Sequence, residues 1–176
     1  MDFDWNTQLV DQLDWHWQNH LRPRFDAMTV EEYFWEPVAG CWSVRRHPDA
    51  GYFFEHEWPP PSAPPVTTIA WRLGHLIVGV FGQRNAGHFG GPPCEVDTFA
   101  YAGTPGEALE RLDEAYAMWT TGVRSLGEDG IFDPCGPSEG PFAEFPMAAL
   151  VLHINREAIH HGAEVLLLRD LYRNRG

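Results

Sequence analysis

Apolar residues recur at helical spacing in four long segments of the chain. In the first, from Trp5 to about Leu21, apolar side chains return every three or four positions between Asp, Gln and Asn. This pattern is typical of an amphipathic helix. Pro23 removes a backbone donor soon afterwards, so we expect a kink or break there, with helix resuming to Met28.

We predict mostly irregular structure between the first and second long helices. Thr29 with Glu32 three residues later resembles a capping box and predicts one short helix. From His47 to Val66 the chain is a connector, because five prolines between residues 59 and 65 cannot donate to a regular hydrogen-bond ladder. No run of alternating β-branched residues is bounded by hairpin turns, so we expect no sheet.

The second long helix is apolar almost throughout its first half. It is predicted to begin at Thr67 or Thr68, either of which can cap, and to run through TIAWRLGHLIVGVFGQRNAG. Such a helix is expected to be buried on most sides.

The third and fourth helices are bounded by capping residues and prolines. Thr104 caps the third, Pro105 takes its first helical position and Gly127 follows its end. Pro146 opens the last helix, which continues to about Tyr172 and ends in a basic segment, as the helix dipole favours.

These elements predict an all-α fold, a four-helix bundle with long crossover loops. The linkers after the first and third helices have the length that such crossings need. At 176 residues the chain is the size of one domain, and we assign residues 1–176 to it.

Charge and cysteine content exclude several classes of protein. The chain has 12 Lys+Arg against 25 Asp+Glu, a formal charge of -13, so its field repels nucleic acids and anionic membranes. Neither a secretion signal nor a long apolar span is present, and we expect a cytoplasmic protein. Cys41, Cys94 and Cys135 lack CxxC spacing and are expected to be reduced thiols.

The last predicted helix carries the polar stretch HINREAIHHGAE, residues His153 to Glu164. At about 100° per residue its charged and imidazole side chains share one arc of roughly 140°. This face meets the apolar face at Glu157 and His161. A solvated stripe is one explanation, but the concentration of histidine, the commonest metal ligand, favours a metal site.

Spacing indicates which side chains bind the ion. Glu157 and His161 lie at i and i+4, where two side chains can meet at one ion. Glu157 with His160 would suit a carboxylate-bridged di-metal bundle, but Arg72 stands where the second glutamate is needed. His75, a lone polar group on the apolar second helix, is the best third ligand.

Two alternatives remain open for these histidines. His75 can also be a hydrogen-bonded core histidine. His16 and His20 on the first helix have i, i+4 spacing too and form a competing pair, although their polar neighbours favour a solvated or pocket-rim position.

The sequence resembles the DinB/YfiT-like superfamily of metal-binding four-helix bundles, in particular its actinobacterial branch. The matching segments are LRPRFDAMTVEEYFWEPVAGCWSVR, TIAWRLGHLIVGVFGQRN and LHINREAIHHGAEVLLLRDLY. In that family one ligand comes from the second helix and two from the last, which implies His75, Glu157 and His161 here. A His-Glu-His site is similar to that of the mycothiol-dependent maleylpyruvate isomerase.

The resemblance implies a metal-dependent thiol S-transferase. Zinc is favoured as the divalent ion, with nickel as the alternative, and mycothiol is the implied thiol, joined to a small electrophile. The isomerase has a further C-terminal domain, so we expect thiol transfer rather than isomerisation. A hydrolase using metal-bound water and a non-catalytic stress-response module that binds metal are the alternatives, and two bundles could pair through an apolar helix face.

Further side chains are candidates for binding the thiol or the electrophile. His153 and His160 lie just off the ligand face and could orient Glu157, and an arginine could bind a carboxylate. Surface exposure and core packing are the alternatives. The candidates are Trp42, Arg45, Trp71, His153, Arg156 and His160.

Overall fold

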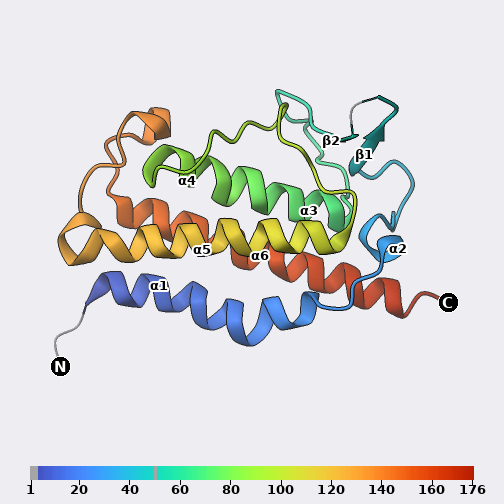
Figure 1. The fold of residues 1–176 in the computed structure, drawn as a ribbon, viewed down its shortest axis with the longest axis horizontal. Helices are drawn as coiled ribbons and strands as arrows, with labels where there is room; N and C mark the ends of the chain where they lie inside the picture. Colours follow the sequence, from blue (N-terminus) through green and yellow to red (C-terminus); the bar gives the residue numbers. More distant parts are fainter. Residues whose placement is uncertain (1–3, 50) are drawn as a thin grey trace.

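Four long helical segments lie side by side in the computed structural model, which describes residues 4–49 and 51–176 (Figure 1). The predicted all-α bundle is confirmed. Two of the four segments change helix type along their length. The helical elements are α1 (Trp5–His16), the π-helical η1 (Trp17–Leu21), the 3₁₀ turn η2 (Arg22–Phe25), α2 (Val30–Tyr33), α3 (Ile69–His75), the π-helical η3 (Leu76–Gly82), α4 (Gln83–His88), α5 (Pro105–Gly130), the 3₁₀ turn η4 (Pro137–Phe142) and α6 (Met147–Arg173).

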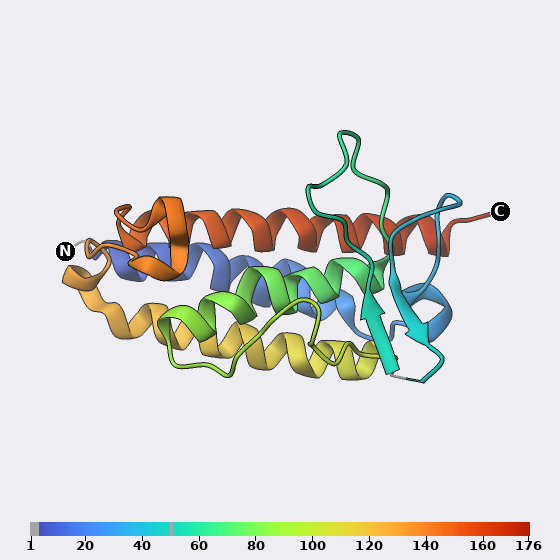
Figure 2. The same cartoon turned by 90° about the horizontal axis from the view of Figure 1, so that it is seen from above.

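The connection that crosses the bundle differs from the predicted ones. α1 and α6 run in one direction, whereas α3–α4 and α5 run in the other (Figure 1). The crossing segment is therefore residues 89–104, which return along the bundle from the end of α4 to the start of α5 (Figure 2). The linkers after the first and third helices instead join helix ends at the same end of the bundle.

The predicted caps of the second and third helices are in place. The backbone N–H of Trp71 donates to Thr68 Oγ1 at 3.2 Å, and that of Glu107 donates to Thr104 Oγ1 at 3.3 Å. Gly127, predicted to follow the third helix, has φ +64° and interrupts α5 there before one more turn.

The first helical segment covers the predicted range from Trp5 to Leu21, but helix does not resume as far as Met28. Beyond His16 the backbone passes into π-helix and then 3₁₀ geometry, with Pro23 inside η2. Asp26 is extended and Ala27 has φ +56°, so no helix reaches Met28. The missing amide of Pro23 and the left-handed residue together explain why helix does not resume.

A two-stranded hairpin corrects the expectation of no sheet. β1 (Val44–His47) pairs antiparallel with β2 (Gly51–Phe54). Each strand has only four residues, and β1 contains two adjacent arginines, so the alternation that marks a strand is absent. Gly51 has φ +78°, which glycine tolerates at the start of β2. The proline segment that follows is irregular, as predicted.

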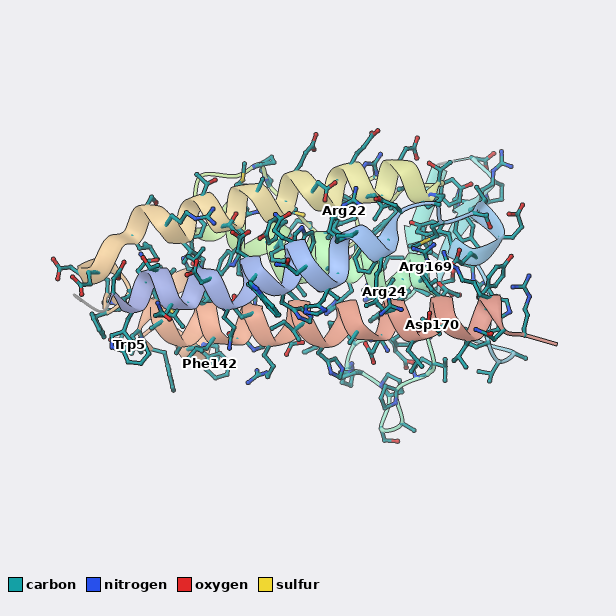
Figure 3. The ribbon with its side chains drawn as sticks, turned by 90° about the horizontal axis from the view of Figure 1, so that it is seen from below. Trp5, Arg22, Arg24, Phe142, Arg169 and Asp170 are labelled. Carbon is teal, nitrogen blue, oxygen red and sulfur yellow. The ribbon has the colours of Figure 1, made fainter. Side chains whose placement is uncertain are left out.

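The core lies between the four helices and is stabilised by aromatic and ionic contacts. Trp17 stacks on Tyr116 with ring centroids 4.0 Å apart. Figure 3 shows Arg169 near the C-terminal end of α6. Arg169 donates to Glu32 at 2.6 Å, and both side chains are buried. Within the described residues, no helix has both the length and the apolar character needed to span a membrane.

Candidate metal centre

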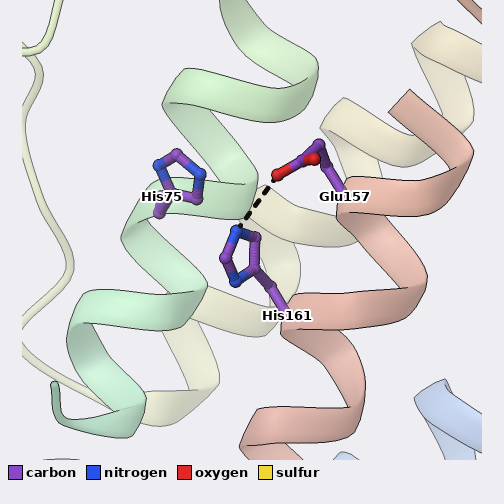
Figure 4. A group of neighbouring side chains, drawn as sticks. All are labelled: His75, Glu157 and His161. Atoms are coloured by element: carbon purple, nitrogen blue, oxygen red, sulfur yellow. Dashed lines mark ion pairs between the residues drawn. The ribbon is translucent and has the colours of Figure 1, made fainter. Parts of the chain in front are cut away.

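His75 from α3 faces Glu157 and His161 from α6 (Figure 4). Their ligand atoms all lie within 4.8 Å of one another. His161 Nε2 is 3.4 Å from Glu157 Oε2. The two imidazole rings are perpendicular, with centroids 4.7 Å apart. The three side chains predicted as ligands thus meet at one point between two helices.

Local backbone geometry brings the three side chains together. α3 and η3 pack along α6, and the i, i+4 spacing of Glu157 and His161 directs both toward that contact. His75 is the last residue of α3, and the π-helical segment η3 starts directly after it. Single π-helical turns inside helices occur frequently at functional sites, because they alter the direction of nearby side chains.

The donor set fits a divalent ion such as zinc. Zn–N and Zn–O distances of about 2.0–2.2 Å in tetrahedral geometry place neighbouring ligand atoms roughly 3.4 Å apart. The 3.4 Å between His161 Nε2 and Glu157 Oε2 agrees with that value. Two imidazoles and one carboxylate leave a fourth position open, as in catalytic zinc sites.

Both imidazoles are held in the neutral form that a metal requires. Burial, with smaller effects from His161 and Arg72, lowers the pKa of His75 to about 4. Burial also lowers the pKa of His161, against the opposing effect of Glu164. At neutral pH each ring therefore keeps a nitrogen lone pair for coordination.

Glu164 orients His161, a role that the sequence interpretation missed. Glu164 Oε2 lies 2.7 Å from His161 Nδ1, so Nδ1–H donates to the carboxylate when Nε2 is the ligand atom. Arg72 Nη1 is 3.1 Å from the same carboxylate oxygen. The i, i+3 spacing of His161 and Glu164 was the signal available in the sequence.

A second group of metal-binding residue types lies on the outer side of His161. His160, His161 and Glu164 also have ligand atoms within 4.8 Å of one another. Arg72 Nη1 lies 3.1 Å from both His161 Nδ1 and Glu164 Oε2. The guanidinium of Arg72 already supplies the positive charge beside these three side chains, so a metal ion there would be repelled. The inner triad of His75, Glu157 and His161 is therefore the better metal site.

Trp71 connects the metal-binding face to the hairpin. Its indole stacks on His75, with centroids 5.3 Å apart, and on Phe54 of β2 at 4.8 Å. Its Nε1–H donates to Glu55 O at 2.8 Å. Trp42 lies one ring further out, 6.3 Å from Trp71. The hairpin therefore restrains Trp71, and Trp71 in turn covers one face of the His75 ring.

Arg45 is committed to contacts around the hairpin. Its Nη1 lies 2.5 Å from Glu36, its Nε donates to Glu55 at 2.9 Å, and its Nη2 donates to Cys41 O at 2.8 Å. The predicted role of Arg45 in binding a carboxylate substrate remains a prediction.

His153, Arg156 and His160 lie along the more exposed side of the triad. Arg156 Nε and His153 Nδ1 are 3.5 and 3.9 Å from Glu157 Oε1. The ring of His160 is 4.9 Å from that of His161. The predicted positions beside the ligand face are therefore observed, while binding of a thiol or electrophile by these residues stays a prediction.

The competing pair on the first helix does not gather a third ligand among the described residues. The rings of His16 and His20 are 5.5 Å apart, and the ring of Trp15 lies 4.8 Å from that of His20. The groups of three or more ligand types in this part of the chain are the inner triad and the outer group around His161.

A family model described as the DinB superfamily matches residues 12–165 of this chain. The chain belongs to the DinB superfamily. The match includes both helices that carry the triad, and members of this superfamily often bind a metal ion. Among curated proteins and among solved structures, no match to the chain was found.

Proposed function

We propose that this DinB-superfamily protein binds one divalent ion, preferentially zinc with nickel as the alternative, and transfers a thiol to a small electrophile. The observation that carries the proposal is the convergence of His75, Glu157 and His161 within 4.8 Å across two helices. Mycothiol is the thiol that the sequence resemblance favours.

When bound, a divalent ion supplies Lewis acidity that lowers the pKa of a thiol at the open coordination position. The chain's own residues would hold the ion and so fix the direction of its open coordination position. His75 and Glu157 approach from opposite helices, and Glu164 fixes the tautomer of His161.

The transfer balances without a further reactant. The thiol R–SH loses its proton to solvent, and the sulfur lone pair forms a C–S bond to the electrophilic carbon. The bond from that carbon to its leaving group breaks at the same time, and the leaving group departs with the bonding electron pair.

Elemental analysis of purified protein tests the metal site. We expect one equivalent of metal in the unaltered chain and loss of it in His75→Ala and His161→Ala. His20→Ala is the matched control, because His20 is an exposed histidine of the competing pair on the first helix. If His20→Ala lost its metal while the other two variants kept theirs, the metal site would lie on the first helical segment instead.

A thiol-consumption assay tests the reaction. Mycothiol, bacillithiol and cysteine are incubated with a panel of alkyl halides and epoxides, and free thiol is followed over time. We expect consumption that requires both metal and His161. Turnover of esters or amides without added thiol would instead support the hydrolase, and metal without turnover in either assay would support a non-catalytic module.

A further inference from the structure

A cleft of about 480 Å³ opens beside the triad, toward the N-terminal end of α6. Its walls combine aromatic and aliphatic side chains with two guanidinium groups and one carboxylate. The residues that line it are Arg84, Cys135, Glu139, Phe142, Phe145, Ala149, Leu150, His153 and Arg156. Its volume is in the range of small-molecule sites, which are mostly apolar with a few polar groups that fix orientation.

One wall of the cleft is in contact with a predicted metal ligand. Arg156 Nε and His153 Nδ1 both approach Glu157 Oε1, at 3.5 and 3.9 Å. His153 precedes Glu157 by four residues, so the cleft begins roughly 6 Å along the helix from that ligand. Arg84 Nη1 donates to the carbonyl of Gly79 at 3.2 Å, and Gly79 lies about one helical turn after His75.

Each guanidinium of the cleft has one carboxylate at the long end of the ion-pair range. Within the described residues, the nearest carboxylate oxygen is 3.5 Å from Arg84, in Glu139, and 3.5 Å from Arg156, in Glu157. Arg84 Nε is buried and has no hydrogen-bond partner in that part of the chain. By contrast, Arg22 lies 2.7 Å from Asp113. Arg156 Nη2 also lies 2.6 Å from His153 Nδ1, and Arg84 Nη1 donates to Gly79 O at 3.2 Å. A guanidinium has five N–H donors, so both arginines keep N–H groups for an anionic ligand.

We propose that this cleft binds a small molecule with a carboxylate and an apolar, preferably aromatic, body. The carboxylate pairs with Arg156 and Arg84, and the apolar body packs on Phe142, Phe145 and Leu150. That this ligand is the electrophile of the thiol transfer rests on the proposed function, whereas the binding itself does not.

A larger hollow of about 750 Å³ on the other side of Arg84 fits such a ligand less well. It shares Arg84, Glu139 and Phe142 with the cleft but adds Glu95, a second carboxylate, and no second arginine. Its remaining walls include exposed proline, glycine and serine residues. An anion would meet a less favourable field there than between two guanidinium groups.

Titration with trans-cinnamate and with its neutral analogue cinnamamide tests the proposal, with binding measured by calorimetry. We expect saturable binding of cinnamate and weaker binding of the amide. Arg156→Gln should weaken cinnamate binding by on the order of fivefold to tenfold and leave the amide unchanged, because it removes one charge-assisted hydrogen bond at a partly exposed site. Phe145→Ala should weaken both ligands.

Arg124→Gln is the matched control, since Arg124 is an exposed arginine of α5 paired with Asp14 and does not line the cleft. Three results would overturn the proposal: no saturable cinnamate binding, equal affinity for acid and amide, or the same loss in Arg124→Gln as in Arg156→Gln. Arg156 is 69% exposed and Phe145 53%, so neither change removes a core contact.

Repeating the titration after chelator treatment separates this inference from the proposed function. Cinnamate binding that survives removal of metal supports the cleft even if no thiol is consumed in the transfer assay. If the protein consumed thiol with neutral electrophiles but bound no cinnamate, the proposed thiol transfer would be supported. The proposed binding of a carboxylate in the cleft would then be refuted.

Discussion

The imidazole of His75 lies directly over the backbone of Gly79. A Cβ atom built on Gly79 would be 2.9 Å from His75 Nδ1 and 3.1 Å from Cε1. No side chain fits there without moving the ring, so the absence of a Cβ at Gly79 is part of what holds the metal-binding imidazole.

Gly79→Ala is expected to change metal affinity and stability in opposite directions. The added methyl displaces the flexible ring of His75, and metal affinity should fall on the order of tenfold to a hundredfold. Alanine favours helix over glycine by roughly 0.5–1 kcal/mol, so the metal-free protein should unfold at the same temperature or higher. Metal titration and thermal unfolding of the metal-free protein measure the two effects.

Gly106→Ala is the matched control, because nothing lies within 4 Å of a Cβ built at Gly106 on α5. It should leave metal affinity unchanged. Equal affinities of Gly79→Ala and the unaltered protein would contradict the assignment of His75 as a ligand.

Glu164→Gln should reduce metal affinity on the order of tenfold to a hundredfold. The amide cannot match the carboxylate as the acceptor for His161 Nδ1–H, and Arg72 loses its ion-pair partner. Asp170→Asn on the same helix, an exposed pair with Arg24, should leave affinity unaltered. A competition titration with a chromophoric chelator compares the variants, and equal values for both would remove Glu164 from the site.

The metal-free protein should lose stability as the pH falls from about 6.5 to about 4. The pKa of His75 is lowered to about 4 in the folded state, so between these values the unfolded chain binds the extra proton. Above pH 6.5 His75 is neutral in both states and its protonation costs the fold nothing. By about pH 4 and below, the free energy of unfolding should have fallen by on the order of 3 kcal/mol. Denaturant unfolding of the unaltered protein and of His75→Gln across this pH range measures the part of the pH dependence that is due to His75. Parallel pH profiles of the two proteins would refute a depressed pKa for His75.

Arg169→Met should destabilise the fold by about 3–5 kcal/mol, because it removes the buried cation 2.6 Å from the carboxylate of Glu32 and leaves only the half-exposed Arg173, at 3.8 Å. Arg169 also donates to the carbonyl of Asp26, which closes the turn after the first helix. Arg24→Met, at an exposed ion pair with Asp170, should cost less than about 1 kcal/mol. Similar chemical denaturation midpoints for both variants would argue against the buried pair as a structural anchor.

Helix positions and the triad were predictable because both follow from local spacing. Thr68 and Thr104 cap as the sequence indicates, and Glu157 and His161 share a face because helix geometry requires it. Placing His75 opposite them depended on the second helix facing the fourth, which the limited arrangements of a four-helix bundle favour.

The features that were missed depend on contacts distant in sequence or on unusual local backbone. Arg72 was considered only as an obstacle to a di-metal site, whereas its partner Glu164 lies on another helix. The hairpin is stabilised by the stacking of Phe54 on Trp71 rather than by strong strand propensity. The crossing segment could not be chosen from linker length alone, because several linkers were long enough.

All three predicted ligands belong to α3 and α6, so residues 76–156 lie between the first ligand and the second along the chain. A bound ion would thus act as a removable cross-link that closes this long loop and fastens the last helix to the second. Since the unfolded chain cannot present the triad, free metal would stabilise the folded state by an amount that rises with the logarithm of its concentration. The supply of the ion would then regulate how long the protein persists as well as what it can react with.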